Sequence, residues 1–140
     1  MPDMTRQRPG TMRLADALKY RLPLAGWVSI LHRASGAILF VLLPFIIWMF
    51  DTSVTSEISF GRFTSAFVAG IGFVPAWLVK LAVLALIWAY LHHFIAGLRH
   101  LWMDATHSVS KEFGRQSALV TLAASGVLTV LLGAKLYGLY

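Results

Sequence analysis

A chain of 140 residues in which 58% are hydrophobic and only 13% are charged has too little polar surface for a soluble domain of this size. It contains no cysteine, so it forms no disulfide and ligates no iron-sulfur cluster, and any electron transfer through it must use histidine-ligated or diffusible carriers. The net charge of +6 would suit nucleic acid, but the cations flank apolar segments, where they act as topology signals, and we expect no nucleic-acid partner.

Residues 1–28 are predicted to form a basic cytoplasmic arm ahead of the membrane domain. The arm is polar and is interrupted at Arg8-Pro9-Gly10, which favours an extended segment that lies on anionic lipid or on a partner subunit. A short helix is predicted at residues 14–18. Pro23 and Trp27 then bring the chain to the membrane interface, where tryptophan is common.

Three apolar segments, at about residues 29–50, 74–98 and 117–137, each reach the ~20 residues that a membrane-spanning helix requires. We therefore predict an all-α integral membrane protein with three transmembrane helices. Residues 29–140 would form the anchor domain, as part of a larger hetero-oligomeric helix bundle. Pro44 is expected to kink the first helix.

Basic residues are distributed unevenly about these spans. Those before the first span are Arg6, Arg8, Arg13, Lys19 and Arg21. The loop over residues 51–73 contains Arg62 as its one basic side chain, whereas the region after the second span contains Arg99, Lys111 and Arg115. By the positive-inside rule, the N-terminus and the second loop are predicted to be cytoplasmic, in a multi-pass protein.

A polar cluster opens the first span, with the sequence SILHRASG over residues 29–36. Ser29 and Arg33 lie one turn apart on one helical face. Ser29 is interpreted either as an N-cap or as a hydrogen-bonding residue of a site. Arg33 either reaches the headgroups or pairs with a buried anion. Ser35 and Gly36 are interpreted as small residues that allow close helix packing.

The second span ends in a polar stretch over residues 90–104. Side chains that share one helical face there, at about 100° per residue, are His93, Gly97, His100 and Asp104. Gly97 leaves a notch one turn from His93, so this face could hold a flat cofactor. An imidazole at membrane depth beside such a notch suits an axial ligand to haem iron, and the alternatives for His93 are a proton-carrying role or a hydrogen-bonded packing residue.

The histidines of this stretch lie at different depths and on different faces. His93 lies about 10 Å deeper than His100, so the two cannot ligate one iron. His92 points about 100° away from His93 and is interpreted as a packing or hydrogen-bonding residue. Side chains at the level of haem propionates or of a quinone headgroup are His100, His32 and Arg33. A second axial ligand is not obvious in this chain.

The first loop and the third span carry no predicted chemistry. The loop contains a weakly amphipathic stretch at residues 58–68. The third span contains small residues that allow close helix contact and has no titratable group before Lys135. We expect its role to be structural.

Residues 29–36 and 93–104, with the sequences SILHRASG and HFIAGLRHLWMD, together resemble the two signatures of one family of membrane proteins. This family comprises the cytochrome b membrane-anchor subunits of succinate dehydrogenase (succinate:quinone oxidoreductase, respiratory complex II). Arg8-Pro9 also resembles the family's basic arm, so the resemblance extends over nearly the whole chain.

The resemblance implies roles for five polar residues of the two segments. His93 corresponds to an axial ligand of haem b, and a second small membrane-anchor subunit would supply the other ligand. Ser29 and Arg33 correspond to residues that contact ubiquinone. His32 and His100 correspond to positions near the haem propionates, with Arg33 in the same vicinity.

The same resemblance implies a non-catalytic subunit that anchors an iron-sulfur subunit and a flavoprotein subunit to the bacterial inner membrane. Electrons would pass from the iron-sulfur subunit to ubiquinone in the tricarboxylic acid cycle and respiratory chain, with no succinate chemistry in this chain. Two alternatives stay open, an anchor of fumarate reductase and a haemless three-helix scaffold or transport protein. The lack of a carboxylate within the three spans argues against a proton relay.

Overall fold

The computed structural model describes residues 14–140, so the expectations for the first part of the arm, including Arg8-Pro9-Gly10, lie outside the described residues. From residue 14 onward the chain is helical and contains no strand. Its helices are α1 (Leu14–Lys19), α2 (Leu24–Val41), α3 (Leu43–Val54), α4 (Glu57–Ala66), α5 (Ala76–Thr106) and α6 (Lys111–Leu136). The prediction of an all-α fold is confirmed.

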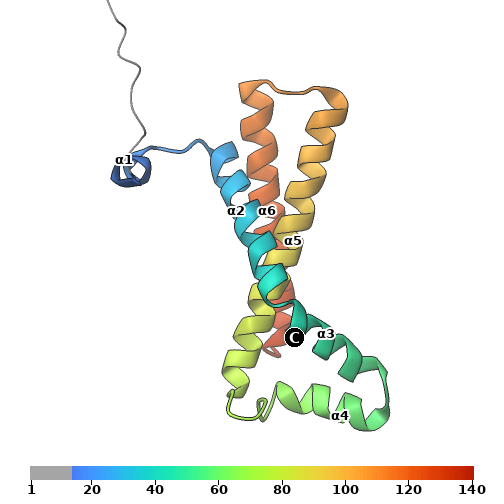
Figure 1. The fold of residues 1–140 in the computed structure, drawn as a ribbon. Coiled ribbons are helices and arrows are strands. Elements are labelled where there is room, and N and C mark those ends of the chain that lie inside the picture. Colours follow the sequence, from blue (N-terminus) through green and yellow to red (C-terminus); the bar gives the residue numbers. More distant parts are fainter. Residues whose placement is uncertain (1–13) are drawn as a thin grey trace, which may run out of the picture.

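Three of these helices, α2, α5 and α6, are long and apolar enough to cross a membrane, with mean hydropathies of 1.4, 1.8 and 1.9 in their most apolar windows. They pack against one another as a bundle whose members cross near the middle, and α1 stands clear of it (Figure 1). Between 11% and 28% of the residues in these windows are buried within the chain, so most of the apolar surface faces outward, as lipid or a membrane partner requires. The chain is a multi-pass membrane protein.

The first apolar segment, expected as one span over residues 29–50, consists of two helices. α2 already begins at Leu24 and ends at Val41, and α3 then begins with Pro44 in its first turn. Proline has no backbone N–H and its ring clashes with the preceding turn, so one helix cannot run through this position undisturbed. α3 therefore turns away from α2 and pairs with α4 beside the bundle (Figure 1).

The second and third membrane helices extend beyond the ends expected from the sequence. α5 ends at Thr106 and α6 begins at Lys111. His107, with a φ of 52°, stops α5 in the left-handed conformation, and Ser110 caps α6 by accepting a hydrogen bond from the N–H of Phe113. The connector is therefore a tight turn, and the polar stretch at the end of α5 is helical throughout.

Small residues allow the three membrane helices to approach closely. Val28 of α2, Ala96 of α5 and Ala118 of α6 are fully buried and form the centre of the apolar core. Farther along α6, a Cβ added to Gly133 would lie 2.8 Å from Cδ1 of Leu84, so Leu84 packs directly against this glycine. Gly133 and Ala118 thus serve helix packing, as small residues in membrane helices commonly do.

Candidate functional site

Three histidine rings lie in a row between α2 and α5. The rings of His93 and His32 are stacked, with centroids 4.2 Å apart and planes inclined by 20°. The rings of His32 and His100 are 5.2 Å apart and inclined by 44°. His32 is therefore the middle ring, and all three side chains are half-buried. The helical face that carries His93 and His100 on α5 turns toward α2.

The backbone of α2 orients the His93 ring. Its Nδ1 lies 3.0 Å from the carbonyl oxygen of His32 and 3.3 Å from Oγ of Ser35. The Ser35 hydroxyl donates to the same carbonyl oxygen at 2.8 Å. Because a carbonyl oxygen can only accept, Nδ1 of His93 carries a proton and donates it. In a neutral imidazole Nε2 then keeps its lone pair, which is the tautomer of a histidine that binds a metal through Nε2.

Gly36 makes room for this ring. A Cβ at Gly36 would lie 2.9 Å from Cε1 and 3.3 Å from Nδ1 of His93, closer than side chains normally pack. The sequence suggested that Ser35 and Gly36 form a notch for a neighbouring helix. In the structure the notch accommodates the His93 imidazole instead, and Ser35 contributes a hydroxyl beside it.

His32 lies beside the notch expected at Gly97, with its Nε2 3.7 Å from the position that a Cβ at Gly97 would take. That distance is an ordinary van der Waals contact, so the histidine row does not require glycine at residue 97. Asp104, expected on the same face, is exposed and is not part of the row.

His92 faces the other neighbour of α5. It is fully buried, its Nδ1 lies 3.1 Å from Oγ of Ser125 on α6, and its ring stacks on Trp88 with centroids 5.4 Å apart. Its Nε2 is enclosed and has no hydrogen-bond partner among residues 14–140. The Ser125 hydroxyl donates to the carbonyl oxygen of Thr121, which leaves Oγ to accept from His92. His92 is a buried, hydrogen-bonded packing residue, as its direction on the helix suggested.

Ser29 and Arg33 lie inside α2, and no side-chain hydrogen bond joins either of them to the histidine row. The N-cap of α2 is Pro23, so the interpretation of Ser29 as a helix cap is wrong. Ser29 is half-buried and Arg33 is exposed, with no hydrogen bond from the Arg33 guanidinium to the described part of the chain. Both side chains are therefore available to groups outside this chain.

Arg99 is a polar residue that sequence analysis assigned to a loop and to topology alone. It is 9% exposed, and it donates from Nε to Oγ of Ser117 at 2.9 Å and from Nη2 to the carbonyl oxygen of Gly114 at 3.2 Å. The signal that could have found it is periodicity, because His92, Ala96 and Arg99 recur at helical spacing on the face of α5 that packs on α6.

The histidine row does not form a site for a bare metal ion. In residues 14–140 no three His, Cys, Asp or Glu side chains are grouped so that they could hold one. The rings stack rather than converge, and His93 alone presents an oriented imidazole with a free nitrogen. This donor set offers one imidazole nitrogen, which fits a planar metal cofactor better than a bare ion.

Comparison with known proteins identifies relatives over most of the chain. Residues 4–132 match the family described as the succinate dehydrogenase/fumarate reductase transmembrane subunit. The chain is 36% identical over 112 residues to the succinate dehydrogenase cytochrome b556 subunit of Paracoccus denitrificans, which covers 80% of this chain and 81% of that protein. It is 32% identical over 130 residues to the subunit of the same name from Coxiella burnetii, covering 93% of this chain and 97% of that protein.

Proposed function

Because the chain belongs to the family of succinate dehydrogenase/fumarate reductase transmembrane subunits, we propose that it helps to hold haem b and ubiquinone beside the iron-sulfur subunit. The resemblance of residues 29–36 and 93–104 to this family is confirmed, and the chain is a membrane anchor of the complex. The flavoprotein and iron-sulfur subunits carry out the reaction with succinate at the bacterial inner membrane. Fumarate reduction is the reverse reaction, which the family description also covers.

The hydrogen bond from Nδ1 of His93 to the carbonyl oxygen of His32 is the observation that carries the haem proposal. It fixes the tautomer and the ring orientation and leaves Nε2 for iron. When bound, haem b supplies a one-electron carrier whose potential depends on its axial ligands and on the hydrogen bonds to them. His92 is unsuited to this role, because it is fully buried within the chain and its Nε2 is enclosed.

His32 and His100 continue the row from His93 toward the end of α5 that meets α6. Both rings are half-buried and carry nitrogen atoms that donate hydrogen bonds to carboxylates. We assign them to the haem propionates, with the second axial ligand supplied by a second small membrane-anchor subunit. The order of the three rings supports this assignment, because His32 lies between His93 and His100.

Ser29 and Arg33 are assigned to ubiquinone. They lie one turn apart on α2, and Arg33 presents an exposed cation beside the half-buried Ser29 hydroxyl. A hydroxyl that donates to a quinone oxygen holds the ring in place. A guanidinium at the same level stabilises the negative charge that builds on the quinone oxygens as electrons arrive.

The test is the haem content of the assembled complex when His93 is replaced. His93→Ala should abolish or severely reduce the haem b measured as pyridine haemochrome, while the flavin and iron-sulfur content of the complex is unchanged. His107→Asn is the matched control, because His107 is an exposed histidine in the left-handed conformation that asparagine tolerates. Wild-type haem content in His93→Ala, or the same loss only in His92→Ala, would remove His93 from the site.

A further inference from the structure

Arg99 is a buried cation without an acidic partner in the described part of the chain. Its two hydrogen bonds go to neutral acceptors, Oγ of Ser117 and the carbonyl oxygen of Gly114, and it forms no ion pair within the described residues. A guanidinium removed from water without an anion is unfavourable, and most buried arginines are paired. The histidine row faces α2, away from this side chain, so the proposed haem and quinone sites do not use Arg99.

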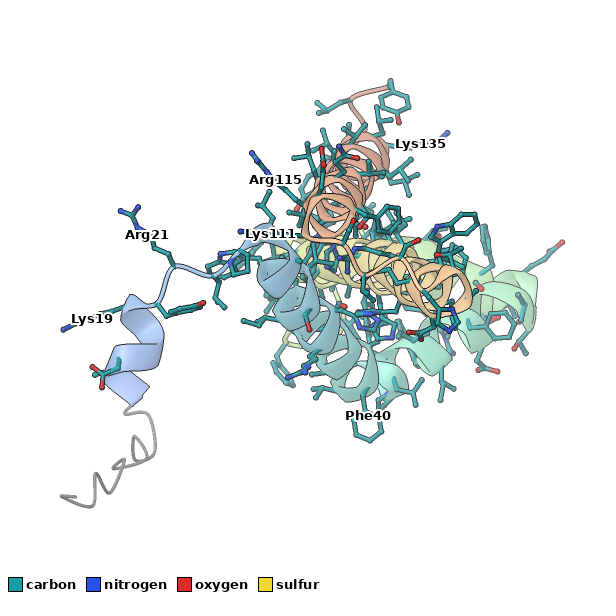
Figure 2. All side chains as sticks on the ribbon, turned by 90° about the horizontal axis from the view of Figure 1, so that it is seen from above. Lys19, Arg21, Phe40, Lys111, Arg115 and Lys135 are labelled. Carbon is teal, nitrogen blue, oxygen red and sulfur yellow. The ribbon has the colours of Figure 1, made fainter. Side chains whose placement is uncertain are left out.

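A cavity of about 770 Å³ adjoins Arg99 between the start of α2, the end of α5 and the start of α6. Its charged lining consists of the cations Arg99, Lys111 and Arg115 and one carboxylate, Glu112. Its apolar lining comprises Pro23, Leu24, Ala25, Met103 and Val109. In Figure 2, Lys111 and Arg115 point to the same side of the bundle as Arg21, and Lys135 points to the other side. The cavity therefore combines excess positive charge with an apolar wall.

The space on the other side of Arg99 differs in character. A smaller hollow of about 480 Å³ there is lined by aromatic, aliphatic and neutral polar groups, among them Trp102, Phe113 and Gln116, with no second charged side chain. An anion that compensates Arg99 would also interact with Lys111 and Arg115 if it lay in the larger cavity, and with no further cation if it lay in the smaller one. The larger cavity is the place for the anion.

We propose that the larger cavity binds the phosphate of an anionic phospholipid such as phosphatidylglycerol, with an acyl chain along its apolar wall. Trp27 and Trp102 are exposed at this end of the bundle, as side chains at a membrane–water interface are. Residues 1–13 would not supply the negative charge that the cavity favours, because this segment contains three arginines, Arg6, Arg8 and Arg13, and one acidic residue. A zwitterionic lipid brings an ammonium group that the three cations repel, so the site favours a lipid with net negative charge.

The test titrates lipid into the purified, delipidated complex that contains this chain with its partner subunits. Bound phosphatidylglycerol and phosphatidylcholine are counted by native mass spectrometry. Lys111→Gln and Arg115→Gln remove exposed cations at the start of α6 and leave the buried hydrogen bonds of Arg99 in place. Each should weaken phosphatidylglycerol binding about 5-fold, and the double variant roughly 25-fold. Lys135→Gln, at the far end of α6, is the matched control and should change nothing.

Three results would overturn the proposal. The first is equal phosphatidylglycerol affinity in the wild type and in the double variant Lys111→Gln/Arg115→Gln. The second is displacement of the lipid by inorganic phosphate alone, which would make the ligand a free anion without a need for the apolar wall. The third is a crosslink from residue 111 or 115 to an acidic segment of a partner subunit that fills the cavity. Phosphatidylcholine binding that stays weak and is unaffected by both substitutions supports the charge-selective site.

Discussion

Replacement of Gly36 by alanine tests the geometry that holds the His93 imidazole. A Cβ at this position would lie 2.9 Å from Cε1 of His93, whereas carbon atoms pack at about 3.5–4.0 Å. The ring must therefore retreat from α2 by at least about 0.6 Å. Its hydrogen bond of 3.0 Å to the His32 carbonyl oxygen, on the same helix, then stretches to about 3.6 Å, where it is no longer a hydrogen bond.

The expected consequence is weaker haem binding in Gly36→Ala. Loss of the orienting hydrogen bond costs about 1 kcal/mol, and loss of such a partner typically lowers the affinity of a metal ligand by about 10- to 100-fold. The assay is a haem titration of the haem-depleted complex, followed by the reduced-minus-oxidised absorbance spectrum and the midpoint potential. Both report on the ligand field at the iron, independently of quinone reductase activity.

Gly97→Ala is the matched control. A Cβ there meets Nε2 of His32 at 3.7 Å, an ordinary contact, so the variant should bind haem nearly as well as the wild type. Both substitutions add a similar gain of about 0.5–1 kcal/mol in helix stability, which cancels in the comparison. The opposite pattern, in which Gly97→Ala loses haem and Gly36→Ala keeps it with an unshifted spectrum, would show that the macrocycle requires the glycine at residue 97 and would refute this reasoning.

Three further outcomes follow from the site. Arg33→Leu should lower quinone reduction roughly 30- to 1000-fold, while succinate oxidation with a soluble electron acceptor is retained. Ser29→Ala should lower quinone reduction less, because it removes a neutral hydrogen bond. Unchanged quinone reductase activity in Arg33→Leu, with normal assembly, would return Arg33 to the role of a headgroup anchor. Ser125→Ala should destabilise the complex by about 1–3 kcal/mol in thermal unfolding, because it leaves both nitrogens of buried His92 without a partner, yet the haem spectrum should not shift. Expression of the chain without its partner subunits should not yield a haem-loaded, monodisperse monomer in size-exclusion chromatography, and recovery of one would contradict a shared pair of axial ligands.

The sequence alone predicted that His32 lies near His100, but not that its ring also stacks on His93. Helical spacing distinguishes His93 from His92, because a rotation of about 100° separates a side chain that faces α2 from one that faces α6. Spacing within one helix carries no information on the crossing of α2 and α5. That crossing places His32 over Gly97 and Gly36 against His93. The glycine that accommodates His93 is thus on the neighbouring helix.

The ends of the membrane helices were predictable only to within one or two turns. Mean hydropathy falls where histidine and arginine appear, so hydropathy predicts that the second span ends before Arg99. In the structure α5 continues to Thr106. A continuous apolar run also conceals the break at Leu42, since hydropathy does not change there and a proline can either kink or end a helix. The burial of Arg99 follows from the longer helix, which carries its side chain into contact with α6.

The polar side chains of α5 divide into two groups with different requirements. Those that face α6 have hydrogen-bond partners within the chain, Ser125 for His92 and Ser117 for Arg99, although the charge of Arg99 has no acidic partner in the described part of the chain. Those that face α2 remain half-buried. An arginine at the centre of a membrane helix raises the free energy of insertion by roughly 2.5–3.5 kcal/mol. An anionic or polar neighbour from outside the chain would lower this cost for Arg33, which is exposed beside that face, and a metal would stabilise the lone pair on Nε2 of His93 more than lipid does. The α2 side of the bundle therefore favours a cofactor and a second membrane subunit, because these supply the missing partners and cover the apolar surface around them.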